Sequence, residues 1–287
     1  MAFRTYYRLV KPGIVYGNVI TAAAGGLLAS RNGVDLGLIA ATLSGLALVI
    51  ASAGVFNNYI DRGLDAKMDR TKKRALAAGL ISPLAAMIYA SILVVAGFGL
   101  LIFFTNWLTV TVAALAEFFY VVVYGVAKRR SVHGTVVGSL PGAAPPVIGY
   151  VAVSGHLDGA ALILFLALVF WQMPHFYAIA IYRYKDYKNA GLPVLPVEKG
   201  LTAAKVQIVA YTIAFCAAVI ALKVFAYAGW AYLLVVGLAA LAWLKVGLDG
   251  FWVKDSAKWA RRMFFYSLIV NLIFAFMVAA NNWLAKL

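Results

Sequence analysis

The stretch Asn57-Asn58-Tyr59-Ile60-Asp61-Arg62-Gly63-Leu64-Asp65-Ala66-Lys67-Met68-Asp69-Arg70-Thr71-Lys72-Lys73-Arg74 is the most informative part of this chain. It follows a long apolar run, and it holds three carboxylates and six cations between Asp61 and Arg74, although the whole chain has only 10 acidic residues. Asn57, Asp61, Asp65 and Asp69 are spaced four apart, so on a helix they would share roughly one face. Carboxylates at this spacing repel each other unless a cation lies among them.

Oxygen ligands on one helical face suit a hard divalent cation that keeps part of its water shell and takes further oxygens from a phosphate. The surrounding Arg and Lys side chains suit the phosphate itself. The stretch therefore predicts a Mg²⁺–diphosphate site at a membrane surface. The alternative is a charged loop that only anchors a helix at the cytoplasmic face. Anchoring needs cations alone, and carboxylates weaken it.

The composition is typical of a polytopic helical membrane protein. Of 287 residues, 64% are hydrophobic and 12% are charged, and the mean hydropathy is +0.90. The apolar segments are continuous rather than alternating, which argues against a β-barrel. The single cysteine, Cys216, excludes an intramolecular disulfide and a cysteine metal cluster. We expect an all-α fold with nine transmembrane helices around a central cavity open to the cytoplasm. The expected segments are 14–30, 36–60, 84–104, 107–127, 134–153, 160–182, 203–222, 230–248 and 262–284.

The basic residues lie almost entirely on one side of this predicted topology. All but Arg31, Lys223 and Lys286 of the 25 Lys and Arg residues fall at the N-terminus or in loops on the same side. The positive-inside rule then places the N-terminus in the cytoplasm and the C-terminus outside. A collar of positive charge facing anionic lipid also explains the net charge of +15 without nucleic acid. The N-terminal residues show no signal-peptide core, so we expect a prokaryotic plasma membrane rather than an organelle.

A second charged loop, Arg183 to Pro193, follows the sixth segment as the first motif follows the second. This offset suggests that segments one to four are repeated as segments five to eight within a single domain, 1–287. Asp186 would then lie across the cavity mouth from Asp61. The alternative for Asp186 is an interfacial carboxylate paired with Arg183 or Lys185.

Two further polar residues lie within apolar segments. Glu117 is the only acidic residue deep in such a segment, and Tyr120, Tyr124 and Lys128 follow it on the same helical face. This stripe suggests a cavity wall, although a Glu satisfied by a neighbouring hydroxyl is an equal alternative. His175 follows Pro174 in the sixth segment and could contact a metalloporphyrin or be a hydrogen-bonded structural residue. The sequence has no His-x-x-x-His pattern and no Ser/His/Asp pattern of hydrolytic enzymes.

Taken together, these motifs resemble the UbiA superfamily of intramembrane prenyltransferases, and within it the protoheme IX farnesyltransferases, or heme O synthases. The resemblance covers about 57–200. It departs from the wider superfamily at Asn58, where many relatives have Asp, and at Ala190, where the second motif usually has a second Asp. The matching pieces are Asn57 to Arg74, Tyr124 with Lys128-Arg129, His133-Gly134-Thr135 through Pro145-Pro146, Trp171 through Tyr177, and Asp186-Tyr187 with Ala190-Gly191 and Leu195-Pro196-Val197.

The resemblance implies transfer of the farnesyl group of farnesyl diphosphate to a vinyl group of heme b, with addition of water, giving heme O and diphosphate. It implies Mg²⁺ as cofactor and the lipid bilayer as surroundings. The implied catalytic residues are Asn57, Asp61, Asp65 and Asp186, of which the first three hold the metal and Asp69 is a lesser candidate. The implied diphosphate-binding residues are Arg62, Arg70, Lys73, Lys128, Arg129 and Lys185. The implied heme and prenyl pocket contains Glu117, Tyr59, Tyr124, His175, Phe176 and Tyr177.

Three other functions remain open at this point. One is a related prenyltransferase with an aromatic or lipid acceptor. Another is a heme or ion transporter whose Asp loops form a gate, although only Glu117 lies deep enough for an intramembrane relay. The third is a structural membrane subunit, which the regularly spaced carboxylates Asp61, Asp65 and Asp69 disfavour. The sequence predicts no oligomeric state.

Overall fold

The computed structural model describes residues 2–31 and 33–284, and these contain nine helices that are long and apolar enough to cross a membrane. Each coincides with one of the expected segments, so the prediction of an all-α polytopic fold is confirmed. The nine are α2 (Pro12–Ala29), α3 (Leu36–Asp65), α4 (Pro83–Phe104), the continuous run Trp107–Arg130, α7 (Gly134–Ser154), α8 (Gly159–Tyr182), α11 (Gly200–Val224), α12 (Trp230–Asp249) and α13 (Ser256–Leu284).

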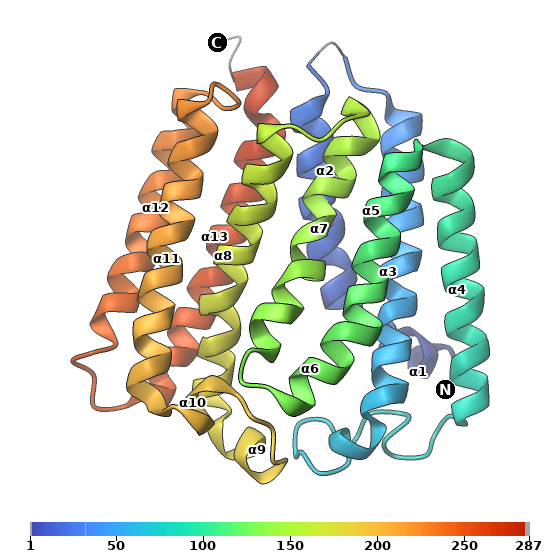
Figure 1. Cartoon of the computed structure of the whole chain (residues 1–287), viewed down its shortest axis with the longest axis vertical. Coiled ribbons are helices and arrows are strands. Elements are labelled where there is room, and N and C mark those ends of the chain that lie inside the picture. Colours follow the sequence, from blue (N-terminus) through green and yellow to red (C-terminus); the bar gives the residue numbers. More distant parts are fainter. Residues whose placement is uncertain (1, 32, 285–287) are drawn as a thin grey trace.

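The short elements gather at one end of the bundle, the lower end in Figure 1. They are α1 (Ala2–Leu9), α9 (Tyr184–Asn189), α10 (Leu195–Glu198) and the turn-rich segment 66–82 that follows α3. The loop between α12 and α13 lies at the same end. The basic loops of the sequence therefore share one end, and α13 finishes at the other.

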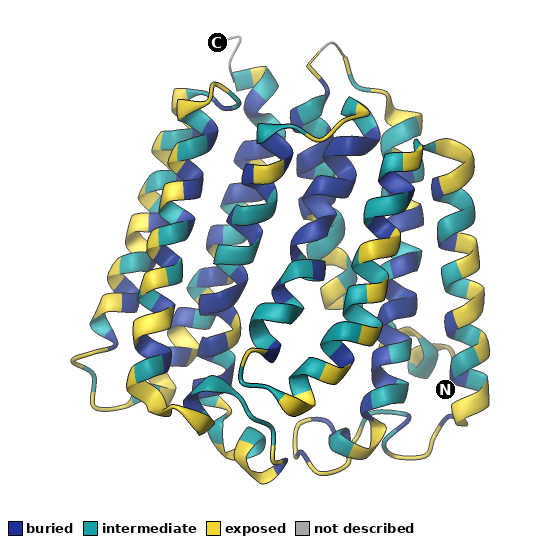
Figure 2. Cartoon of the chain, in the orientation of Figure 1, coloured by how far each residue is buried: buried dark blue, intermediate teal, exposed yellow. Residues whose placement is uncertain are grey.

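Helices α7 and α8 form the interior of the bundle, whereas α4 lies at its edge with a largely exposed outer face (Figure 2). Small residues bring α7 against α2. A Cβ atom on Gly149 would overlap the backbone carbonyl of Ala22, and one on Gly25 would overlap that of Pro146. Because backbone atoms cannot swing aside, these glycines set how closely the two helices approach.

The fourth spanning run is not a uniform α-helix. It divides into α5 (Trp107–Phe118), the π-helix η1 (Phe119–Tyr124) and α6 (Gly125–Arg130). A π-helix widens the turn and is often found at functional sites. Apolar periodicity does not reveal such a segment, so it was not expected from the sequence.

We predict that Gly149→Ala lowers the stability of the protein by about 1–3 kcal/mol, because the new methyl group meets the Ala22 carbonyl. Gly99→Ala in α4 is the matched control, since a Cβ there meets nothing within 4 Å. The thermal unfolding midpoint of the detergent-solubilised protein measures both. Equal midpoints for the two variants would contradict the proposed close packing of α2 and α7.

Candidate functional site

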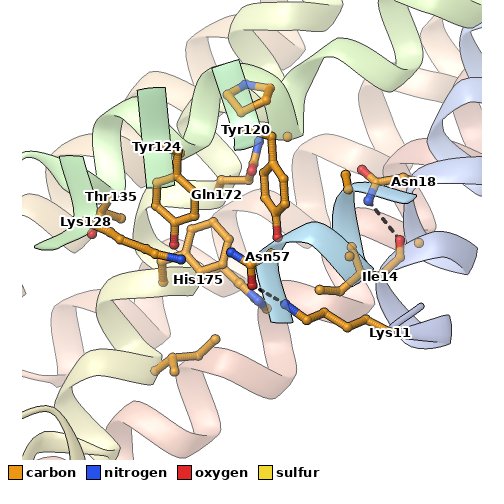
Figure 3. Close-up of a pocket in the computed structure, with 18 of the residues that line it drawn as sticks. Lys11, Ile14, Asn18, Asn57, Tyr120, Tyr124, Lys128, Thr135, Gln172 and His175 are labelled. Carbon is orange, nitrogen blue, oxygen red and sulfur yellow. Dashed lines mark hydrogen bonds between the residues drawn. The ribbon is translucent and has the colours of Figure 1, made fainter. Parts of the chain in front are cut away.

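A cavity of about 670 Å³ opens between the spanning helices (Figure 3). Its wall is formed by residues of α2, α3, the α5–η1–α6 run, α7, α8 and α13, together with the loops after α3 and α9. A volume of this size is typical of a site for a small organic ligand. The expected central cavity is therefore present.

The residues Asn57, Asp61, Asp65 and Asp69, spaced four apart, are called the aspartate ladder below. The end of α3 presents the first three of them to this cavity. Asn57, Asp61 and Asp65 all line it, and they are 6%, 9% and 5% exposed. The helix continues past the apolar segment as far as Asp65, whose backbone carbonyl accepts a hydrogen bond of 3.0 Å from Thr71 Oγ1. Asp69 lies beyond the helix end, where its side chain is 81% exposed and 2.6 Å from Lys72. The ladder thus contributes three residues rather than four.

Each buried carboxylate has a basic partner from a distant segment. Asp61 pairs with Lys128 and, through Oδ1, with Arg129 at 3.1 Å. Both oxygens of Asp65 accept from Arg74 Nη1 at 2.9 Å. Leaving such a carboxylate buried without a partner would cost several kcal/mol, roughly 3–5. These pairs therefore fix the positions of α6 and the 66–82 segment relative to α3.

Lys11 supplies a fourth cation, which was not among the residues predicted from the sequence. It precedes α2 in a left-handed backbone conformation with φ 53°, and its Nζ donates to Asn57 Oδ1 (Figure 3). The neighbouring Asn58 Nδ2 donates to the Leu9 carbonyl at 2.8 Å, which ties the α1–α2 connection to α3. Burial, and then the nearby charges of Arg74 and Lys128, lower the pKa of Lys11 to about 7.

The polar stripe of the α5–η1–α6 run forms a second wall. Glu117, Tyr120, Tyr124 and Lys128 all line the cavity, as the sequence predicted for this face. Ser52 Oγ lies 3.2 Å from Glu117 Oε1 and donates to it, so a neighbouring hydroxyl satisfies this carboxyl as well. Lys128 Nζ lies 5.1 Å from the centroid of the Tyr124 ring. Glu117 is therefore both part of the cavity wall and hydrogen-bonded to a hydroxyl on a neighbouring helix.

A third wall comes from α8. Trp171, Gln172, His175 and Phe176 line it. Gln172 Nε2 donates to the carbonyls of Ser139 and Leu168 at 3.2 and 3.1 Å, which holds its amide beside Gly142. A Cβ on Gly142 would lie 2.0 Å from Gln172 Oε1, so a larger residue there would displace the amide. His175 and Gln172 project into the space shown in Figure 3.

The structure does not bring every candidate to the cavity wall. Arg62 lies over the Tyr59 ring at 4.4 Å, and Tyr59 packs with the cluster around Leu9 and Val55 instead of lining the cavity. Tyr177 is buried in the core, with its ring centroid 6.5 Å from that of Tyr211. The candidates absent from the wall are Tyr59, Arg62, Lys73, Arg129, Tyr177, Lys185 and Asp186; Arg129 still reaches Asp61.

Asp186 is not among the residues that line the cavity. Its carboxylate lies 3.9 Å from Arg183, as the alternative interpretation predicted. The next residue, Tyr187, lines the cavity in its place. Lys73, in the turn-rich segment after α3, and Lys185, in α9, are both exposed. The positions of Lys73 and Lys185 in the sequence, near Asp65 and Asp186, did not indicate that their side chains are exposed.

The wall also contains polar and aromatic residues that were not among the candidates. Arg74 lies within the first motif, but its pairing with Asp65 depends on the path of an irregular segment. Lys11, just before α2, and Gln172, in α8, have no sequence signature that shows which way they face. The missed residues of this kind are Lys11, Asn18, Arg74, Thr135, Trp171, Gln172, Tyr187 and Asn271.

The oxygens at the end of α3 fit a divalent cation. Every ligand oxygen of Asn57, Asp61 and Asp65 already accepts from an ammonium or guanidinium group, so these positions favour positive charge. Among the described residues, no three His, Cys, Asp or Glu side chains cluster to form a complete metal cage. Two carboxylates and an amide instead match the way in which Mg²⁺ is held together with substrate phosphates.

Comparison with known proteins agrees with this geometry. The model of the UbiA prenyltransferase family matches residues 18–269. The chain belongs to the UbiA prenyltransferase family. It is a multi-pass membrane protein and a prenyltransferase.

Several curated relatives match over nearly their full length. The chain is 48% identical to the protoheme IX farnesyltransferase of Citrobacter koseri, over 98% of this chain and 95% of that one. It is equally similar to the protoheme IX farnesyltransferase of an Enterobacter species, over 97% of this chain and 95% of that one. The Escherichia coli protein of the same name matches to the same extent as the first.

Solved UbiA structures share the fold at low identity. A digeranylgeranylglyceryl phosphate synthase superposes with a TM-score of 0.80 and 17% identity, covering 99% of both chains. A UbiA homologue from Aeropyrum pernix in its apo form gives 0.71 at 21% identity, over 94% of this chain and 98% of that one. A homologue from Archaeoglobus fulgidus bound to GPP and Mg²⁺ gives 0.68 at 17% identity, over 96% and 99%.

We predict that binding of inorganic diphosphate with Mg²⁺ weakens in the wild-type protein as the pH rises through about 7, because Lys11 then loses its charge. The pKa of Lys11 is lower in the folded chain than in the unfolded chain, so folding disfavours its charged form. The free energy of unfolding therefore increases as the pH rises above 7 and folded Lys11 loses its proton. Lys11→Arg keeps its charge and should flatten this part of the pH profile. Calorimetric titration between about pH 6 and about pH 9 measures both; superimposable profiles would contradict the role of Lys11.

Proposed function

We propose that this protein transfers the farnesyl group of farnesyl diphosphate to a vinyl group of heme b, with addition of water, and releases heme O and diphosphate. One observation carries the proposal: a single cavity joins the carboxylate and cation cluster at the end of α3 to an aromatic wall that contains His175. A charged head group, an isoprenoid chain and a flat metalloporphyrin could all be accommodated by surfaces of these kinds.

Ionisation of the allylic C–O bond places negative charge on the departing diphosphate, and groups that stabilise this charge lower the barrier. Lys11, Arg70, Arg74 and Lys128 line the cavity beside the ladder and are the proposed diphosphate ligands. Asn57, Asp61 and Asp65 would hold Mg²⁺, which supplies Lewis-acid neutralisation of the diphosphate when it is bound. Lys11, Arg74 and Lys128 contact Asn57, Asp65 and Asp61 in this structure. A bound diphosphate would compete with these residues for the same cations.

The remainder of the cavity suits a reactive hydrocarbon cation. Tyr120, Tyr124, Trp171 and Phe176 present aromatic rings to it, and ring faces stabilise a nearby positive charge. Exclusion of bulk water by the helices protects such a cation from early hydrolysis. We assign Arg62, Lys73 and Lys185 to the charged surface around the mouth instead of to diphosphate, and Asp186 to holding α9, which carries Tyr187.

The choice of heme b as acceptor rests on the relatives at 48% identity, which are named protoheme IX farnesyltransferases. As the C–O bond to diphosphate breaks, a vinyl carbon of the porphyrin forms a bond to the farnesyl carbon. Water adds to the resulting cation beside the pyrrole ring, and one proton of that water passes to the released diphosphate or to solvent. Among the described residues lining the wall, the buried Gln172 amide offers an oxygen that accepts no protein hydrogen bond and could orient this water.

We further propose a bacterial plasma membrane, a cavity mouth on the cytoplasmic side and one domain spanning 1–287. The collection of basic loops at one end of the bundle supports the orientation. An internal repeat is supported by the similar neighbour order of two helix sets, since α2–α3–α4–α5 and α7–α8–α11–α12 each pack successively.

The orientation predicts that a cysteine placed at Lys67, in a Cys216→Ala background, reacts with a membrane-impermeant maleimide only after the cytoplasmic side is opened. A cysteine at Leu157, at the other end of the bundle, should react in intact cells. Both positions are exposed. The opposite pattern of labelling would reverse the assigned topology.

Asp61→Asn and Asp65→Asn should each reduce heme O formation by at least about 100-fold, because the departing diphosphate loses its metal-centred stabilisation. Asp69→Asn is the matched control from the same ladder, and its exposed carboxylate predicts near wild-type activity. The assay uses purified protein, farnesyl diphosphate, heme b and Mg²⁺, with chromatography of the hemes and a diphosphate assay. Size-exclusion profiles check that the variants remain folded.

The same assay separates the alternative functions. Prenylation of hydroxybenzoate without any of heme b would identify a different acceptor. Transport of heme without release of diphosphate would identify a transporter. Normal heme O formation by Asp61→Asn would refute the proposed site while leaving the reaction in place.

A further inference from the structure

The His175 side chain is held rigidly by three aromatic residues. It is 9% exposed, and its ring lies against Trp171 with centroids 4.9 Å apart and planes at 27°. Phe264 approaches from α13 at 4.8 Å, and Phe176 meets it edge-on at 5.3 Å. Trp171 is itself fixed, because its Nε1 donates to the Ser267 carbonyl at 2.7 Å. These contacts restrict the orientation of the imidazole.

A chain of hydrogen bonds assigns the position of the imidazole proton. Ser267 Oγ donates its only hydrogen to the Phe264 carbonyl at 2.5 Å. His175 Nδ1 lies 2.7 Å from the same Oγ, which can then only accept. Nδ1 is consequently the protonated nitrogen, and Nε2 carries a free lone pair.

Nε2 is the nitrogen left for a ligand. No hydrogen bond to it is formed within residues 2–31 and 33–284, and His175 lines the cavity. A neutral imidazole whose Nδ1–H is fixed by an oxygen, with Nε2 free, is the arrangement by which proteins bind transition-metal ions. Iron in a porphyrin is commonly held by one such histidine.

We propose that His175 Nε2 binds the iron of the heme acceptor as an axial ligand, with Ser267 as the positioning residue that fixes its tautomer. This inference rests on the proposed function. The bond would hold the porphyrin against α8, whereas the diphosphate site belongs to α3, and in Figure 1 these helices lie on either side of α7. Iron ligation would thus set which part of the porphyrin faces the farnesyl carbon.

The test is heme binding without farnesyl diphosphate, so that it does not depend on turnover. Purified full-length protein is titrated with heme b, and the Soret band and the iron–histidine stretching band of the ferrous complex are recorded. The wild-type protein should show both. His175→Ala and the larger His175→Gln should lose the stretching band and weaken heme binding by at least about tenfold. Added imidazole should restore the band in His175→Ala.

Three comparisons make the result specific. Metal-free protoporphyrin IX should bind equally well to wild type and His175→Ala, which also shows that the variant is folded. Ser267→Ala should keep the ligation, lower the stretching frequency and weaken heme binding by about tenfold. His156→Ala is the matched control, because His156 is exposed in the loop before α8, and it should change nothing.

An unchanged stretching band and affinity in His175→Ala would overturn the inference, and so would an equal loss of affinity for the metal-free porphyrin. The proposed function fails separately. Wild-type protein that shows the iron–histidine band but forms no heme O with farnesyl diphosphate would support the ligation and refute the transfer. Wild-type activity in His175→Ala with an unchanged spectrum would refute only the ligation.

Discussion

Two buried carboxylates at the end of α3 impose the constraint on which the site depends. Asp61 and Asp65 are nearly inaccessible to solvent, so each requires positive charge close by. Lys128 and Arg129 come from α6, Arg74 comes from the segment after α3, and Lys11 precedes α2. Parts of the chain far apart in sequence therefore converge on one point at the cavity wall. The same charges can rearrange around a Mg²⁺–diphosphate, because the metal would replace the cations at the carboxylates and the cations would turn to the phosphate.

The cavity divides into parts with different chemistry. The α3 side is charged, whereas α8 and the π-helix contribute tyrosine, tryptophan, phenylalanine and histidine side chains. This division suits a reaction in which a polar leaving group separates from a hydrocarbon that must stay away from water. The solved UbiA structures, at 17–21% identity, support the fold alone. The heme acceptor depends on the curated relatives at 48% identity.

The sequence predicted the helices well because the signal for each one, a long apolar run, is local. It also predicted the ladder, since the four-residue spacing of Asn57, Asp61 and Asp65 is a property of one helix. It did not predict which of the candidate side chains face the cavity, because direction depends on tertiary structure. Asp186 and Lys185 belong to a short helix whose facing side is set by its packing, and Tyr177 turns into the core. Lys11 was missed because its approach to Asn57 requires a left-handed residue and the docking of α1 on α3. The π-helix, which lies between Glu117 and Lys128, has no counterpart in apolar periodicity.

Electron paramagnetic resonance of Mn²⁺ in place of Mg²⁺ tests the central claim most directly, with the full-length protein and a non-reactive farnesyl thiodiphosphate. The account predicts phosphorus hyperfine coupling to Mn²⁺ in the wild-type protein, because in the proposed site Asp61, Asp65 and the diphosphate share the metal. It predicts that the coupling is lost when Asp61 and Asp65 are both replaced by Asn, and that it persists when only the exposed Asp69 is replaced. Undiminished coupling in the double variant would contradict it, since the metal would then be held elsewhere.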